Sequence, residues 1–469
     1  MNSEMNAGNS EPSTGDQDST IHNPGTSVNR RIFRAAVTVT FAGVLVKLVA
    51  ASKEFVVAGV FGRSDAMDAF LIAFLVPGLL VNLFSESMNQ ALIPTLIRVR
   101  ETEGHADAQE LLSSAMAWMC TLLAGGSLAM AALARFLFPL VAEHFSASKL
   151  ALTQQLFYGL LPVVLIAGVA QNCTAVLNTF ERFAWPALAP VVTPLTIILG
   201  AWLTARWLGI WSLVYATVAG TAIHAAIVIW MMRSHGYRFD LKFHALSAGA
   251  REVAGQYGPI LLSGLVASSG LLVDQGMAAA LPPGSVSTLV YANRFVSVIL
   301  NLLAGAIATA VTPYFSQMVA RQDWAGARHT LNTYVRITAL VSLPVAAAMI
   351  FGSRLLVQLT FQHGAFGPQD TDAVAPVQAM YAIQLPFYIV SRVFYRYLVA
   401  IRRTKLILYC GVINLVLDIV LNLVLMRWYG VAGIALATSL WTVSTFIFLG
   451  YWTYRLLPPP APADAEATA

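Results

Sequence analysis

Apolar residues in this chain are gathered into long runs, and short polar segments separate one run from the next. About 20 predominantly apolar residues suffice to cross the hydrocarbon core of a bilayer as a helix. Twelve runs of this kind can be placed, near residues 34–60, 67–97, 113–141, 154–178, 184–206, 209–232, 253–280, 286–319, 330–358, 374–400, 406–427 and 431–455. The pattern predicts an all-α integral membrane protein with about 12 transmembrane helices.

The polar segments predict how the chain is divided. Residues 1–29 are rich in Ser, Asn, Gly and Thr and predict a disordered tail, as do residues 457–469. Residues 233–252 form the longest connection between two runs. This linker is therefore expected to separate an N-terminal six-helix lobe, residues 30–232, from a C-terminal six-helix lobe, residues 253–456.

The two predicted lobes resemble each other in sequence. Residues 91–96 (ALIPTL) end the second run, and residues 310–315 (AVTPYF) end the eighth, 219 positions later. The same separation aligns the tight loop 61–63 with 280–282. Because six spans lie between the copies, both have the same topology. Parallel repeats of this kind predict two lobes around a central cavity that opens alternately to each side.

Basic residues predict the orientation in the membrane. If the N-terminus is cytoplasmic, the segments on its side of the membrane hold 16 Lys and Arg residues, and the opposite loops hold 6. Cytoplasmic loops carry the excess of basic residues in membrane proteins. Both termini are therefore expected in the cytoplasm, with the chain in the inner (cytoplasmic) membrane.

Composition excludes several classes of protein. The chain is 57% hydrophobic and 11% charged, whereas soluble domains carry roughly 25% charged residues. Its net charge of +5 comes from scattered residues, so a nucleic-acid partner is not expected. The three cysteines lie inside apolar runs and have neither metal-site nor disulfide spacing.

Motifs of soluble enzymes are also missing from the sequence. It contains no Walker loop, no dinucleotide-binding glycine pattern and no paired His at metal spacing. A non-enzymatic function without an organic cofactor is expected. A primary ATP-driven pump would need a partner that supplies the motor.

Several ionisable side chains lie inside the predicted spans, where each costs a few kcal/mol. They are Lys47, Lys53 and Glu54 in the first span, Asp68 and Glu86 in the second, Arg294 in the eighth, and Arg392 and Arg396 in the tenth. One interpretation is a cationic, water-filled cavity suited to an anionic group such as a diphosphate. The other is that Lys53 pairs with Glu54 or Asp68, and that Arg396 snorkels to the membrane interface.

A second group of polar residues suggests a cation site. Asn414 and Asp418 are four residues apart and so share a helix face. Asp274 lies midway along the seventh span, and Thr438 lies on the twelfth. Carboxylate, amide and hydroxyl oxygens suit a hard cation such as Na⁺. Hydrogen bonds between neighbouring helices are the alternative explanation.

Several short motifs resemble the MurJ/MviN family of lipid II flippases. The stretches are 61–70 (FGRSDAMDAF), 73–77 (AFLVP), 84–86 (FSE), 93–94 (IP), 177–183 (LNTFERF) with Pro186, Ala189 and Pro190, 284–287 (GSVS), 291–294 (YANR) and 361–366 (FQHGAF). They occur in the family's order and in the expected spans, from about residue 35 to 455.

The resemblance implies the fold of the multidrug/oligosaccharidyl-lipid/polysaccharide exporter superfamily, with two lobes that rock around a cationic cavity. It implies functional roles for basic residues of the first and eighth helices and an acid of the second. Those residues are Lys47, Lys53, Asp68, Ser287 and Arg294, and Glu86 joins them as a predicted substrate-binding residue. It also implies that Asp274, Asn414, Asp418 and Thr438 bind sodium, as they do in some members of the family.

The chain also departs from the family pattern. Lys47 and Lys53 stand where Arg is usual, which keeps the charge but weakens bidentate phosphate recognition. Pro77-Gly78 with Val81 replaces the usual Pro-Asn and Arg, and Asn293 replaces an Asp. The family typically has fourteen spans, and its last pair forms a groove for the polyprenyl tail.

The expected function is translocation of an undecaprenyl-diphosphate-linked glycan, with lipid II as the first choice, by a protein that acts as a monomer. The alternatives are an exopolysaccharide or O-antigen repeat unit as the cargo, or a drug/cation antiporter of the same superfamily. An antiporter would favour acidic over basic cavity residues. A non-transporting membrane assembly partner would tolerate neutralisation of Lys47, Lys53 and Arg294.

Overall fold

The computed structural model describes residues 24–142, 145–177, 179, 184–238, 240–242 and 248–458, and these residues form helices and turns without a strand. The elements are α1 (Pro24–Phe61), α2 (Asp65–Thr102), α3 (His105–Val141), α4 (Ala147–Leu177), α5 (Ala184–Leu188), η1 (Ala189–Val191), α6 (Val192–Leu208), α7 (Trp211–Ser234), α8 (Ala248–Ala279), α9 (Ser285–Ala320), α10 (Trp324–Phe351), α11 (Ser353–Phe361), α12 (Pro368–Ala382), α13 (Gln384–Ala400), α14 (Thr404–Tyr429) and α15 (Val431–Leu456).

The predicted helical membrane fold is confirmed. Eleven segments of the described chain are long and apolar enough to span a bilayer, with α12 and α13 counted together, and α1 occupies the place of the first predicted span. Helix α1 starts at Pro24, so residues 24–29 are helical although they were expected in the tail. Residues 1–23 and 459–469 of the predicted tails lie outside the described residues, as do 178 and 180–183 of one family-like motif.

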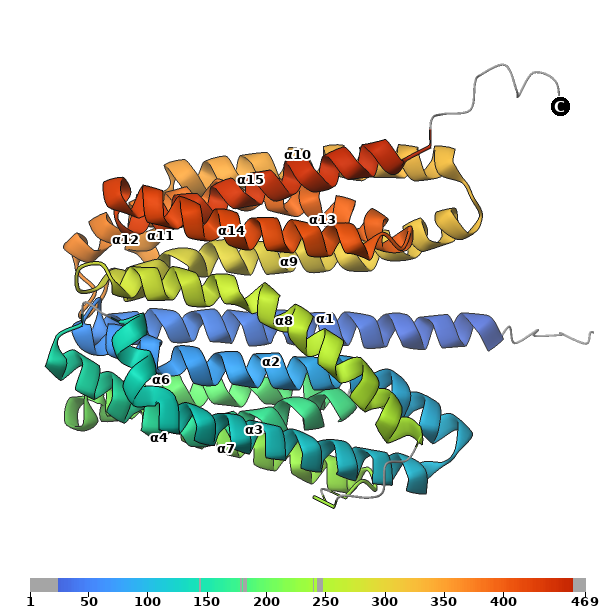
Figure 1. The fold of residues 1–469 in the computed structure, drawn as a ribbon, viewed down its shortest axis with the longest axis horizontal. Helices are drawn as coiled ribbons and strands as arrows, with labels where there is room; N and C mark the ends of the chain where they lie inside the picture. Colours follow the sequence, from blue (N-terminus) through green and yellow to red (C-terminus); the bar gives the residue numbers. More distant parts are fainter. Residues whose placement is uncertain are drawn as a thin grey trace, which may run out of the picture.

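Each half of the chain forms a lobe, and the two lobes repeat one packing plan (Figure 1). In the first lobe α4 packs against α2, α3 and α7, and α6 packs against α7. In the second lobe α13 packs in the same way against α9, α10 and α15, and α14 packs against α15. The predicted parallel repeat is therefore present as a repeat of helix contacts.

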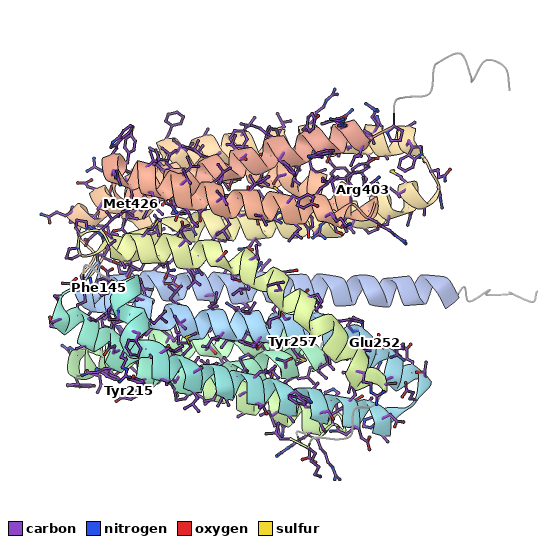
Figure 2. The ribbon with its side chains drawn as sticks, in the orientation of Figure 1. Phe145, Tyr215, Glu252, Tyr257, Arg403 and Met426 are labelled. Carbon is purple, nitrogen blue, oxygen red and sulfur yellow. The ribbon has the colours of Figure 1, made fainter. Side chains whose placement is uncertain are left out.

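Helix α8, the seventh span, connects the lobes. It crosses the front of the molecule obliquely in Figure 1, between the first lobe and the second. Near its start Glu252 pairs with Arg98 of α2 at 2.5 Å, and the Tyr257 hydroxyl donates to the Phe84 carbonyl at 3.4 Å. Figure 2 shows Glu252 and Tyr257 beside the first lobe. Farther along, α8 packs against α14 of the second lobe.

The start of α8 bears on the predicted linker, residues 233–252. Because α8 begins at Ala248, the last residues of this linker are helical and pack on the first lobe. Residues 239 and 243–247 of the linker lie outside the described residues.

The two ends of the bundle differ in how the lobes meet. We call the end where α1 begins and α15 finishes the terminal end. The opposite end carries the turns 62–64, 280–284 and 362–367, and we call it the joint end. At the joint end these three turns of the two lobes contact one another directly.

Candidate functional site

Asp68, predicted to bind substrate, lies in a buried contact between the lobes at the joint end. Asp68 belongs to the first turn of α2, and the residue is only 1% exposed. Oδ2 accepts from the Gly284 amide at 2.7 Å, and Oδ1 accepts from the Ser287 amide at 2.9 Å. These amides lie at the start of α9. The N-cap residue of that helix, Gly284, has no side chain that could accept a hydrogen bond from them. Asp68 therefore caps a helix of the opposite lobe, where the helix dipole favours a negative charge.

Lys149, on α4, completes this contact. Its ammonium group is buried and lies 3.1 Å from Asp68 Oδ2 and 2.6 Å from Asp65 Oδ1, over the ring of Phe145. The buried carboxylate of Asp68 thus has a cation and two amides as partners, which is the condition under which a buried charge is tolerated.

Further contacts fasten the joint. The Arg63 guanidinium donates to Thr288 Oγ1 at 2.5 Å and pairs with Asp370 at 3.4 Å. The Ala365 amide donates to the Gly59 carbonyl at 2.6 Å. This last approach needs a glycine at 364, because a Cβ there would overlap the Gly59 carbonyl. Its φ of +61° also favours glycine.

Ser287 was predicted as a substrate ligand, and the structure places it beside Asp68. Ser287 is fully buried, its amide binds Asp68, and its hydroxyl donates to the Gly284 carbonyl at 3.2 Å. The two residues hold equivalent positions in the repeat, so the joint lies where the repeats meet. Both side chains are engaged within the protein, away from the other predicted substrate ligands.

Lys53, Glu54 and Arg294 form an ion cluster between the lobes. Glu54, on α1, lies 2.9 Å from the Lys53 ammonium and is also bound by the guanidinium of Arg294 on α9. The side chains of Lys53 and Arg294 are 24% and 30% exposed, and that of Glu54 is 10% exposed. One acid thus compensates two cations. The pairing of Lys53 with Glu54 was one of the two alternatives that the sequence left open, and the cluster keeps a net positive charge.

Aromatic rings separate this cluster from the joint. Phe55 packs against Phe295 and Phe361, with ring centroids 5.5 and 5.0 Å apart, and Phe361 packs in turn on Tyr291. The Tyr291 hydroxyl donates to the Gly62 carbonyl at the joint. The cluster lies about 10 Å along α1 from its end, given seven residues at 1.5 Å each. The aromatic layer therefore lies between the charges and the joint.

Lys47 and Glu86 are exposed and take no part in that cluster. Glu86 belongs to a stripe of exposed polar residues on α2 that also contains Asn82 and Gln90, and Gln90 donates to Glu86 at 3.2 Å. Asn82 and Gln90 were not predicted as site residues, although their i, i+4 spacing around Glu86 is visible in the sequence. A polar, exposed stripe in the middle of a spanning helix is suited to water rather than to lipid.

Arg392 and Arg396, left undecided by the sequence, lie among tyrosines on α13. Arg392 stacks on Tyr388 with 4.2 Å between the guanidinium carbon and the ring centroid, and Arg396 lies 5.7 Å from the Tyr395 centroid. Aromatic faces stabilise cations at this range. Within the described part of the chain, neither arginine pairs with a carboxylate.

Three of the four predicted cation ligands meet in the second lobe. Asp274 Oδ2 accepts from the Thr438 hydroxyl at 3.3 Å, and Asp274 Oδ1 accepts from Asn422 Nδ2 at 2.8 Å. The same Asn422 nitrogen donates to Asp418 Oδ1 at 3.2 Å. Asn422 was not predicted, although it lies four residues after Asp418 on the same face of α14.

Asn414, the fourth predicted ligand, is not hydrogen-bonded to the other three. Its amide nitrogen donates to Thr445 at 2.8 Å and contacts the Cys410 sulfur at 3.7 Å. The side-chain oxygens of Asn414 and Asn422 are both buried without a hydrogen-bond partner. Two carboxylates, the Thr438 hydroxyl and the free amide oxygen of Asn422 are a donor set that fits a hard monovalent cation.

The structure also contains an open apolar groove of about 570 Å³, which lies in the first lobe between α3, α4 and α7. Its walls are apolar or small side chains, among them Cys120, Ile166 and Leu241. None of the predicted site residues lines it, and its walls offer nothing to a phosphate.

Comparison with known proteins gives consistent matches. The family model described as "Lipid II flippase MurJ" matches residues 57–461. A probable lipid II flippase MurJ of Rhizobium meliloti is 26% identical over 419 residues, which cover 85% of this chain and 78% of the relative. The lipid II flippase MurJ of Burkholderia cenocepacia is 27% identical over 369 residues, covering 76% and 70%.

Solved structures show the same fold. A structure described as "Lipid II flippase MurJ, inward closed conformation" superposes with a TM-score of 0.78 at 24% identity, covering 90% of this chain and 88% of that one. An inward-facing multidrug transporter of the MATE family and MOP superfamily gives 0.73 at 13% identity, with coverages of 91% and 96%.

Proposed function

Because this chain belongs to the lipid II flippase MurJ family, we propose that it carries lipid II across the cytoplasmic membrane by alternating access. It acts as a monomer, as a transporter and not as an enzyme, and both termini lie in the cytoplasm. The terminal end of the bundle then faces the cytoplasm, and the joint end faces outward. The excess of basic residues at the terminal end supports this orientation.

The observation that carries the proposal is the ion cluster of Lys53, Glu54 and Arg294. Glu54 is the counter-ion of two cations, one from each lobe, when no substrate is bound. A diphosphate brings more negative charge and more acceptor oxygens than a carboxylate. It displaces Glu54 from Lys53 and Arg294, and so loosens the link between α1 and α9 as it binds.

Lys47 and the exposed stripe around Glu86 serve the same substrate. Lys47 lies almost two turns before Lys53 on α1, nearer the terminal end. It provides a first positive charge for a head group that enters from the cytoplasm. Asn82, Glu86 and Gln90 offer hydrogen bonds to polar groups such as sugar hydroxyls.

Asp68 and Ser287 close the outer side in this mechanism and do not touch substrate. With Lys149 and the Arg63–Asp370 pair, they hold the joint shut while the head group loads from the cytoplasm. Opening outward requires the buried Asp68 to leave the start of α9. On the cytoplasmic side, Arg98 contacts Glu252 in the same structure, and this contact has to break for the head group to load while the joint stays shut.

Cation binding is proposed to bias this switch. Asp274 lies on α8, the helix that joins the lobes, and Asp418 and Thr438 lie on α14 and α15. A sodium ion held by these oxygens would fix the second half of α8 to the second lobe. A ligand shifts a two-state equilibrium only by binding one state better than the other. The site therefore links sodium to the position of α8.

Complementation of a conditional lipid II flippase deletion tests the cargo. The parent chain is expected to restore growth, and Lys53→Ala and Arg294→Ala are expected to fail at equal membrane levels. Arg354→Ala is the matched control, since Arg354 is an exposed arginine paired with Asp372 at the joint end. Failure of the parent would reject lipid II as the cargo, and growth with both cluster variants would reject the binding role of the cluster.

A further inference from the structure

The amide of Asn422 lies between two buried carboxylates. Asn422 is fully buried on α14, and its Nδ2 is 2.8 Å from Asp274 Oδ1 and 3.2 Å from Asp418 Oδ1. Its Oδ1 has no hydrogen-bond partner. Nδ2 of Asn422 therefore donates hydrogen bonds to two aspartates on different helices, while Oδ1 of the same side chain accepts none.

This arrangement leaves the charge uncompensated. Within the described chain, no Lys or Arg pairs with Asp274 or Asp418, unlike Asp68 and Glu54, which have cations beside them. An aspartate at the middle of a spanning helix costs about 2.5–3.5 kcal/mol, and two close carboxylates also repel each other. An amide contributes hydrogen bonds but no positive charge. The pair is thus arranged to receive a cation.

We propose that Asn422 is a gatekeeper of the cation site, a role that rests on the cation coupling proposed above. Without a cation, Nδ2 bridges Asp274 and Asp418 and fills the space between them. When a monovalent cation enters, the amide turns over, and Oδ1 replaces Nδ2 and becomes a ligand. The exchange converts a donor into an acceptor at one position. Nδ2 gives up its hydrogen bonds to the two carboxylates, which bind the cation in its place, and Oδ1 gives up no partner.

Asn414 is less suited to this role. Its nitrogen is already bound to Thr445 rather than to a carboxylate. Asn422 instead touches α8 through Asp274 and its own helix through Asp418, so its rotation acts directly on the contact between α8 and α14. Cation binding at this site would therefore change the contact between Asn422 and α8, the helix that joins the two lobes.

Thermal unfolding of the purified full-length protein in detergent tests the proposal without a transport assay. NaCl is titrated against choline chloride at constant ionic strength, and the midpoint temperature gives the half-saturating Na⁺ concentration. The parent should be stabilised by Na⁺. Asn422→Leu should unfold at a lower temperature in choline, because the bridge is lost, and should need at least tenfold more Na⁺. Asn422→Asp, which keeps an oxygen ligand, should still respond to low Na⁺ even though it is the less stable protein in choline.

Asn332→Leu is the control, since Asn332 contacts Tyr454 and no carboxylate. An unchanged half-saturating Na⁺ concentration in Asn422→Leu would overturn the gatekeeper role. If Asp274→Asn and Asp418→Asn then abolish the response, the cation coupling stands and only Asn422 is excluded. A parent that does not respond to Na⁺ would overturn both, whereas the complementation experiment would still decide lipid II transport separately.

Discussion

At the scale of single residues, the buried carboxylates of this protein differ in the groups that compensate their negative charge. Asp68 has a lysine and two backbone amides, and Glu54 has two cations from different lobes. Asp274 and Asp418 share one neutral amide. The degree of compensation matches the proposed roles, since the fully compensated acid closes the joint and the others exchange partners during transport.

Replacement of Glu54 tests the exchange of counter-ions. In Glu54→Gln, Lys53 and Arg294 lose their carboxylate, so an anion should bind more tightly. A unit charge at 4 Å is worth about 1–4 kcal/mol between bulk water and a protein surface, which corresponds to roughly a fivefold or greater gain in affinity. Titration of the purified protein with a short-chain prenyl diphosphate measures it. Weaker binding than in the parent would show that Glu54 helps to hold the head group.

The joint can be tested through Asp68 and Lys149. Loss of one member of a buried charge pair costs about 3–5 kcal/mol, so Asp68→Asn and Lys149→Met should each be strongly destabilising. Because each substitution removes a partner of the other's buried charge, the double variant should be less destabilised than the sum of the two. Unfolding by SDS titration in mixed micelles gives the four free energies. Strict additivity would contradict a direct pairing.

At the scale of elements, two turns and one oblique helix decide how the lobes meet. The turn at Gly364 brings the chain against the end of α1, and the turn at Gly284 presents the amides of α9 to Asp68. At the opposite end Glu252 fastens the start of α8 to α2 of the first lobe, and farther along α8 packs against α14 of the second lobe. Relative motion of the lobes therefore has to break a small number of defined contacts.

Gly364→Ala tests the joint turn. An added Cβ meets the Gly59 carbonyl, and a φ of +61° costs a non-glycine residue about 1–2 kcal/mol. The variant should unfold a few degrees below the parent and should fail to hold the joint closed. Gly367→Ala is the control, because that glycine has a φ of −94° and no atom within 4 Å of an added Cβ. Equal unfolding temperatures for the two variants would contradict a close approach at 364.

At the scale of the whole molecule, alternating access requires both ends to open in turn. The joint end is represented by the contact of Arg63 with Asp370, and the terminal end by the contact of Arg98 with Glu252. The aromatic layer around Phe361 lies between the ion cluster and the joint. The structure thus has direct contacts between the turns of both lobes at the joint end, whereas at the terminal end Glu252 fastens the start of α8 to the first lobe.

Reversible cross-links test this requirement. Cysteine pairs at 63 and 370, or at 98 and 252, would be bridged by a short bis-methanethiosulfonate in a background without Cys120, Cys173 and Cys410. Each bridge should stop growth support or lipid flipping, and a reductant should restore it. Single-cysteine proteins treated in the same way provide the control. Full activity of either bridged protein would show that this contact does not have to open.

The apolar runs determined the helical membrane fold, the order of the spans and their approximate ends, because the length and hydropathy of each run are local properties. The spacing of 219 residues likewise indicated the repeat. Single charges inside apolar runs were visible as candidates for the same reason, since any charge at that depth is unusual. Family motifs added the assignment of Asp68, Ser287 and Asp274.

Only the tertiary structure decided which partners those residues have. In the structure, Asp68 accepts from an amide 216 positions away at the start of α9. Glu54 pairs with Arg294 of the opposite lobe. Asn422, and not Asn414, lies between the two aspartates. Helix periodicity shows which residues share a face, but it does not show which helix packs on that face. Compensation of buried charge depends on that second fact.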